Sequence, residues 1–491
     1  MDWCYNTEEA RCKAGCHYIQ KGIQRKKEIG FSMRIVVIGD GKVGYILTKL
    51  LAQEGHDVVV IDRNPMVLRD AQEKLDVAVL TGNGACAEVQ REAGVPDSDL
   101  LIAATSSDEV NLLCSLIAHK LGCRHIVARV RNPEYDQQMS LLKADLGLSF
   151  TINPEKSAAS EIFRLLQFPQ FLKRDSFAGG RAEMVEIKLP KDSRFIGRRI
   201  DQISDMLKRR ALICVVDRGG KIFIPSGQFT IFSEDKLTIM AATAELPDLI
   251  RRFGVPTKTV EKVMIIGGSR TAAYLTKQLL AARVEVTILE RSYERCEELF
   301  ELLPEATIIN GDGTMQSLLL DEGLEEMDAV ISLTGMDEEN LLVSMFANYI
   351  GVPKTITKIN RLEYTDVLST IGVDTLVSPK LLTANEIVRY VRAVGESGQD
   401  SVETLYRIGE GKAEGLGFTV PQTGAFLGIP LERLPIRKGI LLASIVRNQQ
   451  VIIPRGSDCM MPSDAVIVVA GPEQTIARLT DIFTDNEGRA L

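Results

Sequence analysis

The sequence predicts an α/β protein made of two doubly wound parallel sheets in tandem, each followed by a small β-rich α+β subdomain. Motifs of the first half recur in the second at an offset of 228 or 229 residues, so that Gly39 returns as Gly267 and Pro225 as Pro454. This offset indicates a duplicated pair of domains, because solenoid repeats have periods of about 20–50 residues. Within each half, short β-branched runs alternate with helical patterns, which is typical of a parallel sheet. The length of 491 residues suits such a tandem, since a globular domain has about 100–200 residues.

The composition argues against several classes of protein. The formal net charge is −8, whereas a nucleic-acid-binding protein presents a net-basic face to phosphates, so we expect no nucleic-acid partner. No apolar run reaches the roughly 18 residues that a membrane-spanning helix needs, so any work at a membrane must pass through a partner. The cysteines lie singly among apolar neighbours, which favours a reducing cytosol over a disulfide scaffold.

Residues 1–32 stand outside the repeat. They contain no apolar core long enough for a secretory signal. One interpretation is a disordered extension or a mis-called translation start. The other is a metal cluster of Cys12, Cys16 and His17, with Cys4 as a further ligand, although structural zinc sites usually space and double their ligand pairs more regularly.

The first half opens with a glycine motif in the context that gives it meaning. A β-branched run at 34–38 passes directly into Gly39-Asp-Gly41-Lys-Val-Gly44, and an apolar helical stripe follows. In a Rossmann-like unit the first glycine permits a tight turn, the second lets the backbone approach a pyrophosphate, and the third allows close packing of helix on strand. The helix N-terminus then offers N–H donors to the anion. The motif therefore predicts nucleotide binding.

The next predicted strand, 58–61, ends in Asp62, eighteen residues after Gly44. A carboxylate in this position accepts hydrogen bonds from an adenosine ribose diol and repels a 2′-phosphate. Arg63 beside it softens the exclusion of NADP. The sequence therefore favours NAD.

The alternation of strand and helix continues through the rest of the first sheet. Strands are predicted at 77–80, 100–104 and 125–130, with helices starting at Asn64-Pro65, near 88–93 and at 108–121. Ligands of such sheets lie beyond the carboxyl ends of the strands. The residues at these ends are Gly82 and Asn83, Ala104 and Thr105, and Arg129. Ser106 and Asp108 beside them have a second interpretation as plain helix caps.

The second half repeats this plan with changes in the glycine motif. Ser269 and Ala272 replace the second and third glycines, and Ser269 adds a side chain where a pyrophosphate comes closest. Glu290 keeps the acid, while Thr334 and Lys358 stand where the first half has Thr105 and Arg129. This site either binds a nucleotide more weakly, binds a different one, or is structural.

Each sheet is followed by a connector helix, predicted at 157–166 and 384–394, and then by a β-rich module of hairpin strands. The modules are candidates for effector binding, dimer contacts or structural support. No Ser-His-Asp, Cys-His or paired-carboxylate arrangement can be assembled from the sequence. The partner of each nucleotide domain is a second copy of itself, which indicates regulation. Two alternatives remain: an NAD-dependent oxidoreductase with a substrate site between the halves, and a scaffold with empty pockets.

Several of these motifs together resemble a known protein family. Residues 33–44, Asp62, 104–111 and 128–135 resemble the TrkA family of potassium-uptake regulators, which carry two K⁺-conductance-regulating (RCK or KTN) domains, each with a TrkA C-terminal subdomain. The resemblance extends from Met33 to the C-terminus. It implies RCK N-terminal domains at 33–155 and 261–382 and C-terminal subdomains at 175–250 and 400–485.

The resemblance also implies a function. Such a protein is not an enzyme; it lies in the cytosol, peripheral to the inner face of the plasma membrane, and binds NAD⁺ or NADH and, in some members, ATP or ADP. It assembles as a ring-like homo-oligomer beneath a membrane potassium-transporter subunit of the TrkH, TrkG or KtrB kind and gates it by a nucleotide-driven conformational change. Carried over by position, the first nucleotide site comprises Gly39, Asp40, Gly41, Lys42, Val43, Gly44, Asp62, Gly82, Asn83, Ala104, Thr105 and Arg129. The second site comprises Gly267, Gly268, Ser269, Arg270, Thr271, Glu290, Thr334 and Lys358.

Overall fold

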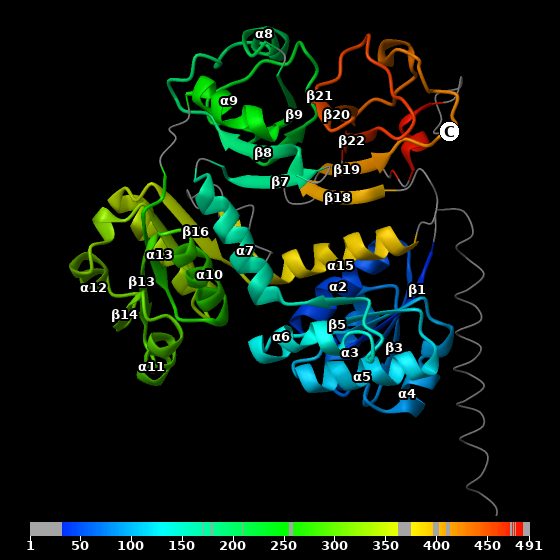
Figure 1. The fold of residues 1–491 in the computed structure, drawn as a ribbon, viewed down its shortest axis with the longest axis vertical. Coiled ribbons are helices and arrows are strands. Elements are labelled where there is room, and N and C mark those ends of the chain that lie inside the picture. The colour runs from blue at the N-terminus through cyan, green and yellow to red at the C-terminus, as the bar shows by residue number, and fades with distance from the viewer. Residues whose placement is uncertain are drawn as a thin grey trace, which may run out of the picture.

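Four β-sheets make up the protein, two parallel ones at one end and two antiparallel ones at the other (Figure 1). The computed structural model describes residues 32–484 except positions 170, 178–179, 209, 255–258, 362–374, 396–401, 409–412, 472–473, 475 and 477. The extension and the cysteine–histidine cluster expected before the repeat lie outside these residues. The expected fold class, two tandem Rossmann-like sheets with β-rich subdomains, is confirmed.

The first parallel sheet has the strand order β3-β2-β1-β4-β5-β6, so the direction of winding reverses between β1 and β4. Its central strands β1 and β4 are buried on both faces, which explains their continuous apolar runs. The strands are β1 Arg34–Ile38, β2 Asp57–Asp62, β3 Ala78–Thr81, β4 Leu100–Ala103, β5 His125–Arg129 and β6 Phe150–Ile152. The helices are α2 Lys42–Gln53, α3 Pro65–Lys74, α4 Ala87–Glu92, α5 Asp108–Leu121 and α6 Pro133–Leu142.

The second parallel sheet copies this order as β14-β13-β12-β15-β16-β17. Its strands are β12 Lys262–Ile266, β13 Glu285–Glu290, β14 Thr307–Asn310, β15 Ala329–Ser332, β16 Lys354–Lys358 and β17 Leu376–Val377. Its helices are α10 Arg270–Ala281, α11 Tyr293–Leu302, α12 Gln316–Asp321 and α13 Asp337–Ile350.

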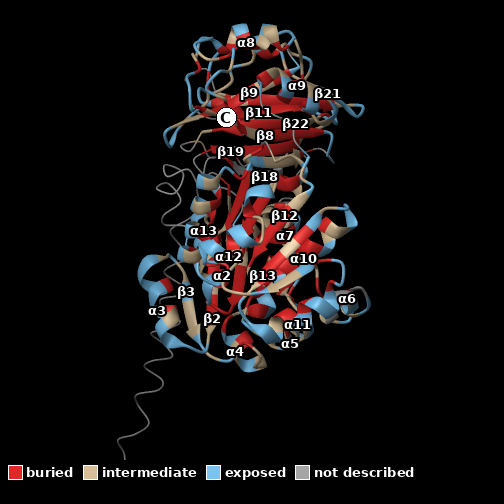
Figure 2. Ribbon diagram, turned by 90° about the vertical axis from the view of Figure 1, so that its left-hand side faces the viewer, coloured by how far each residue is buried: buried red, intermediate tan, exposed pale blue. Residues whose placement is uncertain are grey.

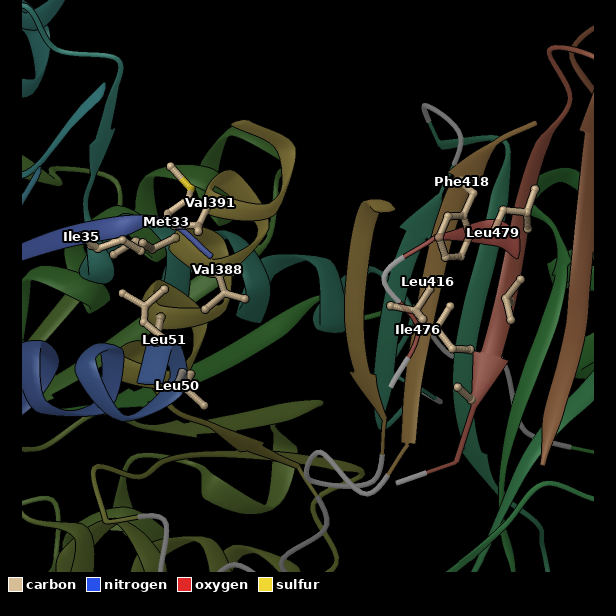
Figure 3. Close-up of a cluster of buried hydrophobic side chains, with 14 of the residues drawn as sticks. Met33, Ile35, Leu50, Leu51, Val388, Val391, Leu416, Phe418, Ile476 and Leu479 are labelled. Carbon is tan, nitrogen blue, oxygen red and sulfur yellow. The ribbon is translucent and has the colours of Figure 1, made fainter. Parts of the chain in front are cut away.

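The two halves exchange their connector helices. Helix α7 (Pro154–Gln167) follows the first sheet but packs on α10 of the second, where Ile162 and Leu165 share a core with Leu275. Helix α15 (Pro379–Gly395) follows the second sheet but packs on α2 of the first, where Val391 shares a core with Leu51 (Figure 3). An apolar face of each helix is therefore buried against the other half. The sequence predicted both helices but not this exchange.

The two β-rich subdomains form five-stranded antiparallel sheets of the same topology, β10-β9-β11-β8-β7 and β21-β20-β22-β19-β18. They pack on each other through one apolar cluster, to which Met184 and Cys214 contribute from the first sheet and Ala443 and Ile467 from the second (Figure 2). The first sheet comprises β7 Lys173–Phe177, β8 Ala182–Lys188, β9 Ala211–Arg218, β10 Lys221–Phe223 and β11 Lys236–Ala242, with helices α8 Ile200–Met206 and α9 Leu246–Phe253. The second comprises β18 Val402–Ile408, β19 Ala413–Thr419, β20 Ile440–Arg447, β21 Gln450–Ile452 and β22 Ala465–Ala470. In the part of the chain that the structure describes, no helix has both the length and the apolarity of a membrane span.

The exchange of the helices predicts that a substitution in one half destabilises a helix of the other half. Ile387 on α15 and Ile162 on α7 are both fully buried, and an Ile→Ala change in a core costs about 2–5 kcal/mol. We expect Ile387→Ala to increase hydrogen–deuterium exchange in α2, in the other half of the chain, and Ile162→Ala to increase it in α10. Mass spectrometry of peptides from both variants checks this. Faster exchange confined to the half that carries the substitution would contradict the described packing.

Candidate functional site

The first glycine loop has the geometry that its sequence predicted. Gly39 has φ +97°, and a Cβ on it would lie 2.9 Å from the backbone of Thr105. A Cβ on Gly44 would lie 1.9 Å from the carbonyl oxygen of Gly39, so helix α2 approaches the loop as closely as only glycine allows. A Cβ on Gly41 would meet no atom within 4 Å. The second glycine therefore faces open space, where a ligand can reach the backbone.

The N-termini of the two equivalent helices differ in their capping. Helix α2 begins after Gly41 with no side-chain cap and no acid in its first turn. Its first N–H groups are therefore available to an anion. Helix α10 begins after Ser269, whose hydroxyl accepts the N–H of Ala272 at 3.3 Å. The serine that replaces the second glycine thus occupies part of its own helix N-terminus.

The acid at the end of the second strand holds the glycine loop in both halves. Asp62 Oδ2 accepts the N–H of Asp40 at 2.8 Å, and Glu290 Oε2 accepts the N–H of Gly268 at 2.6 Å. The other oxygen of each acid accepts the N–H two residues further along the chain, at 2.8 Å in both cases. These bonds orient the carboxylate before any ligand arrives.

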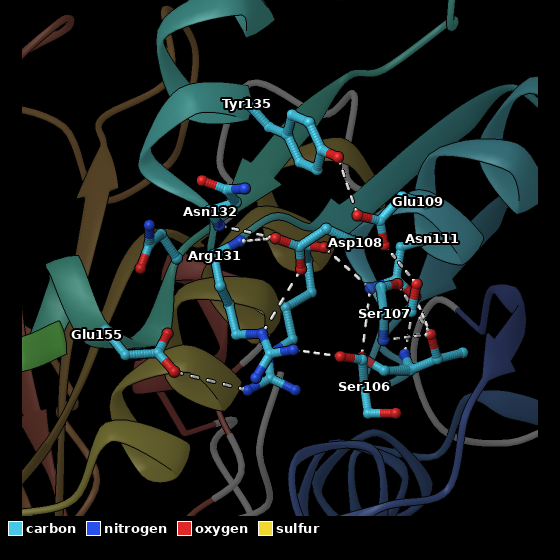
Figure 4. Close-up of polar contacts among 12 residues, drawn as sticks. Ser106, Ser107, Asp108, Glu109, Asn111, Arg131, Asn132, Tyr135 and Glu155 are labelled. Carbon is cyan, nitrogen blue, oxygen red and sulfur yellow. Dashed lines mark hydrogen bonds and ion pairs between the residues drawn. The ribbon is translucent and has the colours of Figure 1, made fainter. Parts of the chain in front are cut away.

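A buried asparagine joins the ends of the fourth and fifth strands. Asn111 Oδ1 accepts the N–H of Thr105 at 2.8 Å, and its Nδ2 donates to the carbonyl oxygen of Arg129 at 2.9 Å (Figure 4). Asn340 makes the same two bonds in the second half, to Thr334 at 2.8 Å and to the carbonyl of Lys358 at 3.1 Å. We did not predict this role. Its only sequence signal is the recurrence of Asp-x-x-Asn at the common offset.

Asp108, three residues before Asn111, stabilises the turn that follows β5. Asp108 Oδ2 accepts the N–H groups of Arg131 and Asn132, both at 2.7 Å. It is therefore more than a helix cap. The cap of α5 is Ser107, whose hydroxyl accepts the N–H of Val110 at 3.3 Å.

A cleft of about 710 Å³ lies between the halves and is lined by both of them. From the first predicted site it includes Gly39, Gly41, Lys42, Val43, Asp62, Gly82, Asn83, Ala104, Thr105 and Arg129. From the second it includes Ser269, Arg270, Thr271 and Lys358. The first residues of the exchanged helices, Pro154 and Glu155 of α7 and Pro379 and Lys380 of α15, complete it.

The remaining predicted residues lie elsewhere. Gly44 is packed behind the first loop, and Asp40 is buried beside it. Neither lines the cleft, and the same is true of Gly267, Gly268, Glu290 and Thr334. The structure therefore brings the first predicted set together almost whole and adds to it part of the second.

The cleft is basic although the chain is acidic. Six basic residues line it and two acidic ones. The basic ones are Lys42, Arg63, Arg129, Arg270, Lys358 and Lys380, and the acidic ones are Asp62 and Glu155.

Burial and neighbouring cations lower the pKa values of Lys380 and Arg129. Burial lowers the pKa of Lys380, and the positive charge of Lys42 lowers it further. Burial likewise lowers the pKa of Arg129, and Arg131 and Arg270 add to the effect. Nε of Arg129 is buried with no hydrogen-bond partner among the described residues. An anion in the cleft would relieve both conditions.

Comparison with protein families identifies the repeat. A TrkA-N domain model matches residues 35–153 and 263–379, and a TrkA-C domain model matches 184–254 and 416–484. The chain belongs to the TrkA family. The resemblance seen in the sequence is thereby confirmed. Its relatives include proteins named for Trk potassium uptake.

Curated relatives match almost end to end. The TrkA homolog 2 of Methanosarcina mazei is 34% identical over 446 residues, which cover 89% of this chain and 97% of the relative. The TrkA homolog of Archaeoglobus fulgidus is 34% identical over 451 residues, or 92% of this chain and 100% of the relative. The Trk system potassium uptake protein TrkA of Haemophilus influenzae is 27% identical over 458 residues, 92% of this chain and 98% of its own length.

Solved structures share the fold at lower identity. The RCK domain of GsuK has a TM-score of 0.59 at 18% identity and covers 93% of this chain and 97% of its own. The GsuK channel bound to NAD has a TM-score of 0.59 at 18% identity, with 93% of this chain and 81% of that chain covered. These likenesses support the four-module architecture.

The asparagine clamps make a prediction that separates the halves. Asn111→Ala leaves the partly buried N–H of Thr105 and carbonyl of Arg129 without this partner, and an unsatisfied buried group costs about 1–3 kcal/mol. We expect faster hydrogen exchange in β4 and β5 but unchanged exchange in β15 and β16. Asn340→Ala is the matched control and should give the reverse. If either variant leaves its own pair of strands as protected as in the wild type, the clamp is not what holds them.

Proposed function

We propose that this chain is the nucleotide-sensing regulatory subunit of a Trk-type potassium-uptake system. It acts from the cytosolic side of the plasma membrane on a potassium-transporter subunit of the TrkH, TrkG or KtrB kind. The relatives support this, since their names place them in Trk potassium uptake. The observation that carries the proposal is the basic cleft whose walls come from both halves of the chain.

The residues of the cleft suit an adenine nucleotide bound across it. Asp62 accepts the ribose hydroxyls, and the uncapped N-terminus of α2 takes the first phosphates. Arg270 and Lys358 then meet the far end of the phosphate chain from the other half. NAD⁺, NADH, ATP and ADP all carry this ribose and phosphate arrangement. They differ in how much negative charge they present to the cations of the second half.

The exchanged helices connect the cleft to the rest of the molecule. Helix α7 starts at the cleft with Pro154 and Glu155, and α15 starts there with Pro379 and Lys380. Each leads on to the first strand of an antiparallel subdomain, β7 or β18 (Figure 1). A ligand that binds both walls better when they are close favours the closed arrangement, and such couplings are typically about 1–3 kcal/mol. The helices transmit this closure towards the subdomains and the transporter.

Ring formation is supported by an apolar surface on α13. Leu342, Met345 and Tyr349 lie at i, i+3 and i+7, and their exposed fractions are 66%, 40% and 85%. The equivalent helix of the first half exposes Leu113, at 47%. Exposed apolar rows on a helix indicate a contact with another protein. We assign this surface to a second copy of the chain, because related surfaces on the two halves allow copies to join repeatedly and close a ring.

Nucleotide binding across the halves can be tested by titration calorimetry. We expect Arg270→Gln to weaken binding of ADP and NADH by about tenfold to a hundredfold, because a hydrogen bond to a charged group contributes roughly 1.5–3 kcal/mol. Arg291→Gln is the matched control, an exposed arginine of the same half that does not line the cleft. NADH should stay unconsumed throughout. Failure of NAD⁺, NADH, ATP and ADP all to bind the wild type would overturn the proposed function.

The assembly surface makes a separate prediction. Leu342→Glu together with Tyr349→Glu places charges on the α13 row, and we expect the ring to dissociate into smaller species on size-exclusion chromatography with light scattering. Nucleotide affinity should remain, because the row lies on the outside of α13. Tyr293→Glu, an exposed aromatic position on α11, should leave the ring intact. A ring that tolerates the double change would exclude this surface as the contact.

A further inference from the structure

Asp40 is a buried carboxyl group without a partner inside the first glycine loop. Only 1% of it is exposed. Both of its carboxyl oxygens are buried and have no hydrogen-bond partner among the residues that the structure describes. An ionised carboxylate is strongly disfavoured in such a place, because nothing replaces its hydration.

The neighbouring helix makes room for this group. In the second half Gly268 stands at the equivalent position, and a Cβ there would lie 2.5 Å from Cδ1 of Leu299 on α11. The first half has Ala71 at the corresponding position of α3, where it is fully buried. The space that Leu299 fills in the second half is therefore available to the carboxyl of Asp40 in the first.

The second half also has a cation that the first half lacks. Arg295 donates from Nε to the carbonyl oxygen of Gly268 at 2.7 Å and pairs with Glu298 at 2.6 Å. Val67 occupies the position of Arg295 in α3. The first loop is thus built around an acid with no counter-ion.

The charges that act on Asp40 are both negative. Asp62, at the end of β2, accepts a hydrogen bond from the backbone N–H of Asp40. Asp70 lies on α3. Burial, then Asp62, then Asp70 raise the pKa of Asp40 to about 7. Two cations of these elements have other partners, since Arg63 donates to Asn83 at 2.6 Å and Lys74 pairs with Asp70 at 3.5 Å.

We propose that Asp40 links nucleotide binding at the first glycine loop to proton binding, so that the protein senses pH together with nucleotide. This inference rests on the proposed function, since it concerns the same cleft. The loop and the N-terminus of α2 attract a pyrophosphate with N–H groups. An ionised Asp40 within that loop opposes the pyrophosphate, whereas a protonated Asp40 does not. Binding of the anion therefore favours the protonated form and takes up a proton.

The direction of the effect follows from this linkage. Below pH 7 Asp40 is already protonated and affinity is highest. As pH rises, binding must first protonate the group, and affinity falls. If the bound anion raises the pKa of Asp40 by about one unit, the dissociation constant rises about tenfold between the two limits.

The experiment is titration calorimetry of the full chain with NAD⁺ from pH 6 to 8.5, in buffers of different ionisation enthalpy. NAD⁺ is the probe because its pyrophosphate diester does not titrate in this range. We expect the dissociation constant of the wild type to rise about tenfold, with proton uptake near pH 7. Asp40→Asn, which keeps the shape but never ionises, should bind with the low-pH affinity at every pH and take up no proton. Asp70→Asn is the control and should keep the pH dependence, with its midpoint slightly lower.

A second variant tests the inference if Asp40→Asn does not fold. Asp40→Gly copies the residue of the second half and should also bind independently of pH. A wild-type affinity that does not change with pH, or a pH dependence that persists in both variants, would overturn the inference. Loss of binding at every pH in both variants would overturn it too, because Asp40 would then be needed for binding itself. Absence of NAD⁺ binding by the wild type would instead count against the proposed function.

A stability measurement gives an independent readout on the free protein. Because the folded state raises the pKa of Asp40 from 3.8 to about 7, it binds more protons than the unfolded state between these values. The wild type should therefore lose stability as pH rises from 4 to 7 and stay at the lower level above. Asp40→Asn should lack this contribution, so its melting midpoint should exceed that of the wild type at pH 8. Equal midpoints at pH 8 would show that Asp40 is not held in a strained ionised state.

Discussion

The structure depends on one constraint: each exchanged helix buries an apolar face against the opposite half of the chain. Helix α15 completes the core beneath the first sheet, and α7 completes the core beneath the second. Neither sheet has its full apolar cover without a segment from the other half. The two glycine loops are consequently held facing one space, and the starts of both helices lie at its edge. The shared cleft follows from how the cores are filled.

The duplicated halves have kept the parts that build the frame and changed the parts that face the cleft. Both retain the asparagine clamp, at Asn111 and Asn340, and the acid that holds the glycine loop. They differ at the helix N-termini, since α2 is uncapped while Ser269 caps α10. The first half therefore presents an uncapped helix N-terminus to the cleft. The second supplies cations such as Arg270 to the same space.

The sequence predicted what is decided locally. The strands and the backbone geometry at Gly39, Gly41 and Gly44 follow from periodicity and local sterics, and the structure agrees. The exchange of α7 and α15 could not be predicted, because an apolar stripe shows that a helix face is buried but not which sheet buries it. For the same reason the second site looked separate, although Arg270 and Lys358 face the first. Asn111 was missed because its partners are 6 and 18 residues away, beyond any helical or turn spacing.

The electrostatics of the cleft connect the charge of a ligand to the distance between the two walls. In an acidic chain, six basic side chains are gathered from both halves around one space, and their mutual repulsion opposes its closure. A polyanion placed between them turns that repulsion into attraction across the same surfaces. The gain is larger when the walls are closer, so the ligand binds the closed arrangement better, which is the condition for shifting a conformational equilibrium. Under the proposed function, occupancy of the cleft changes the relation between the halves. The exchanged helices, whose residues Glu155 and Lys380 line the cleft, then move with it.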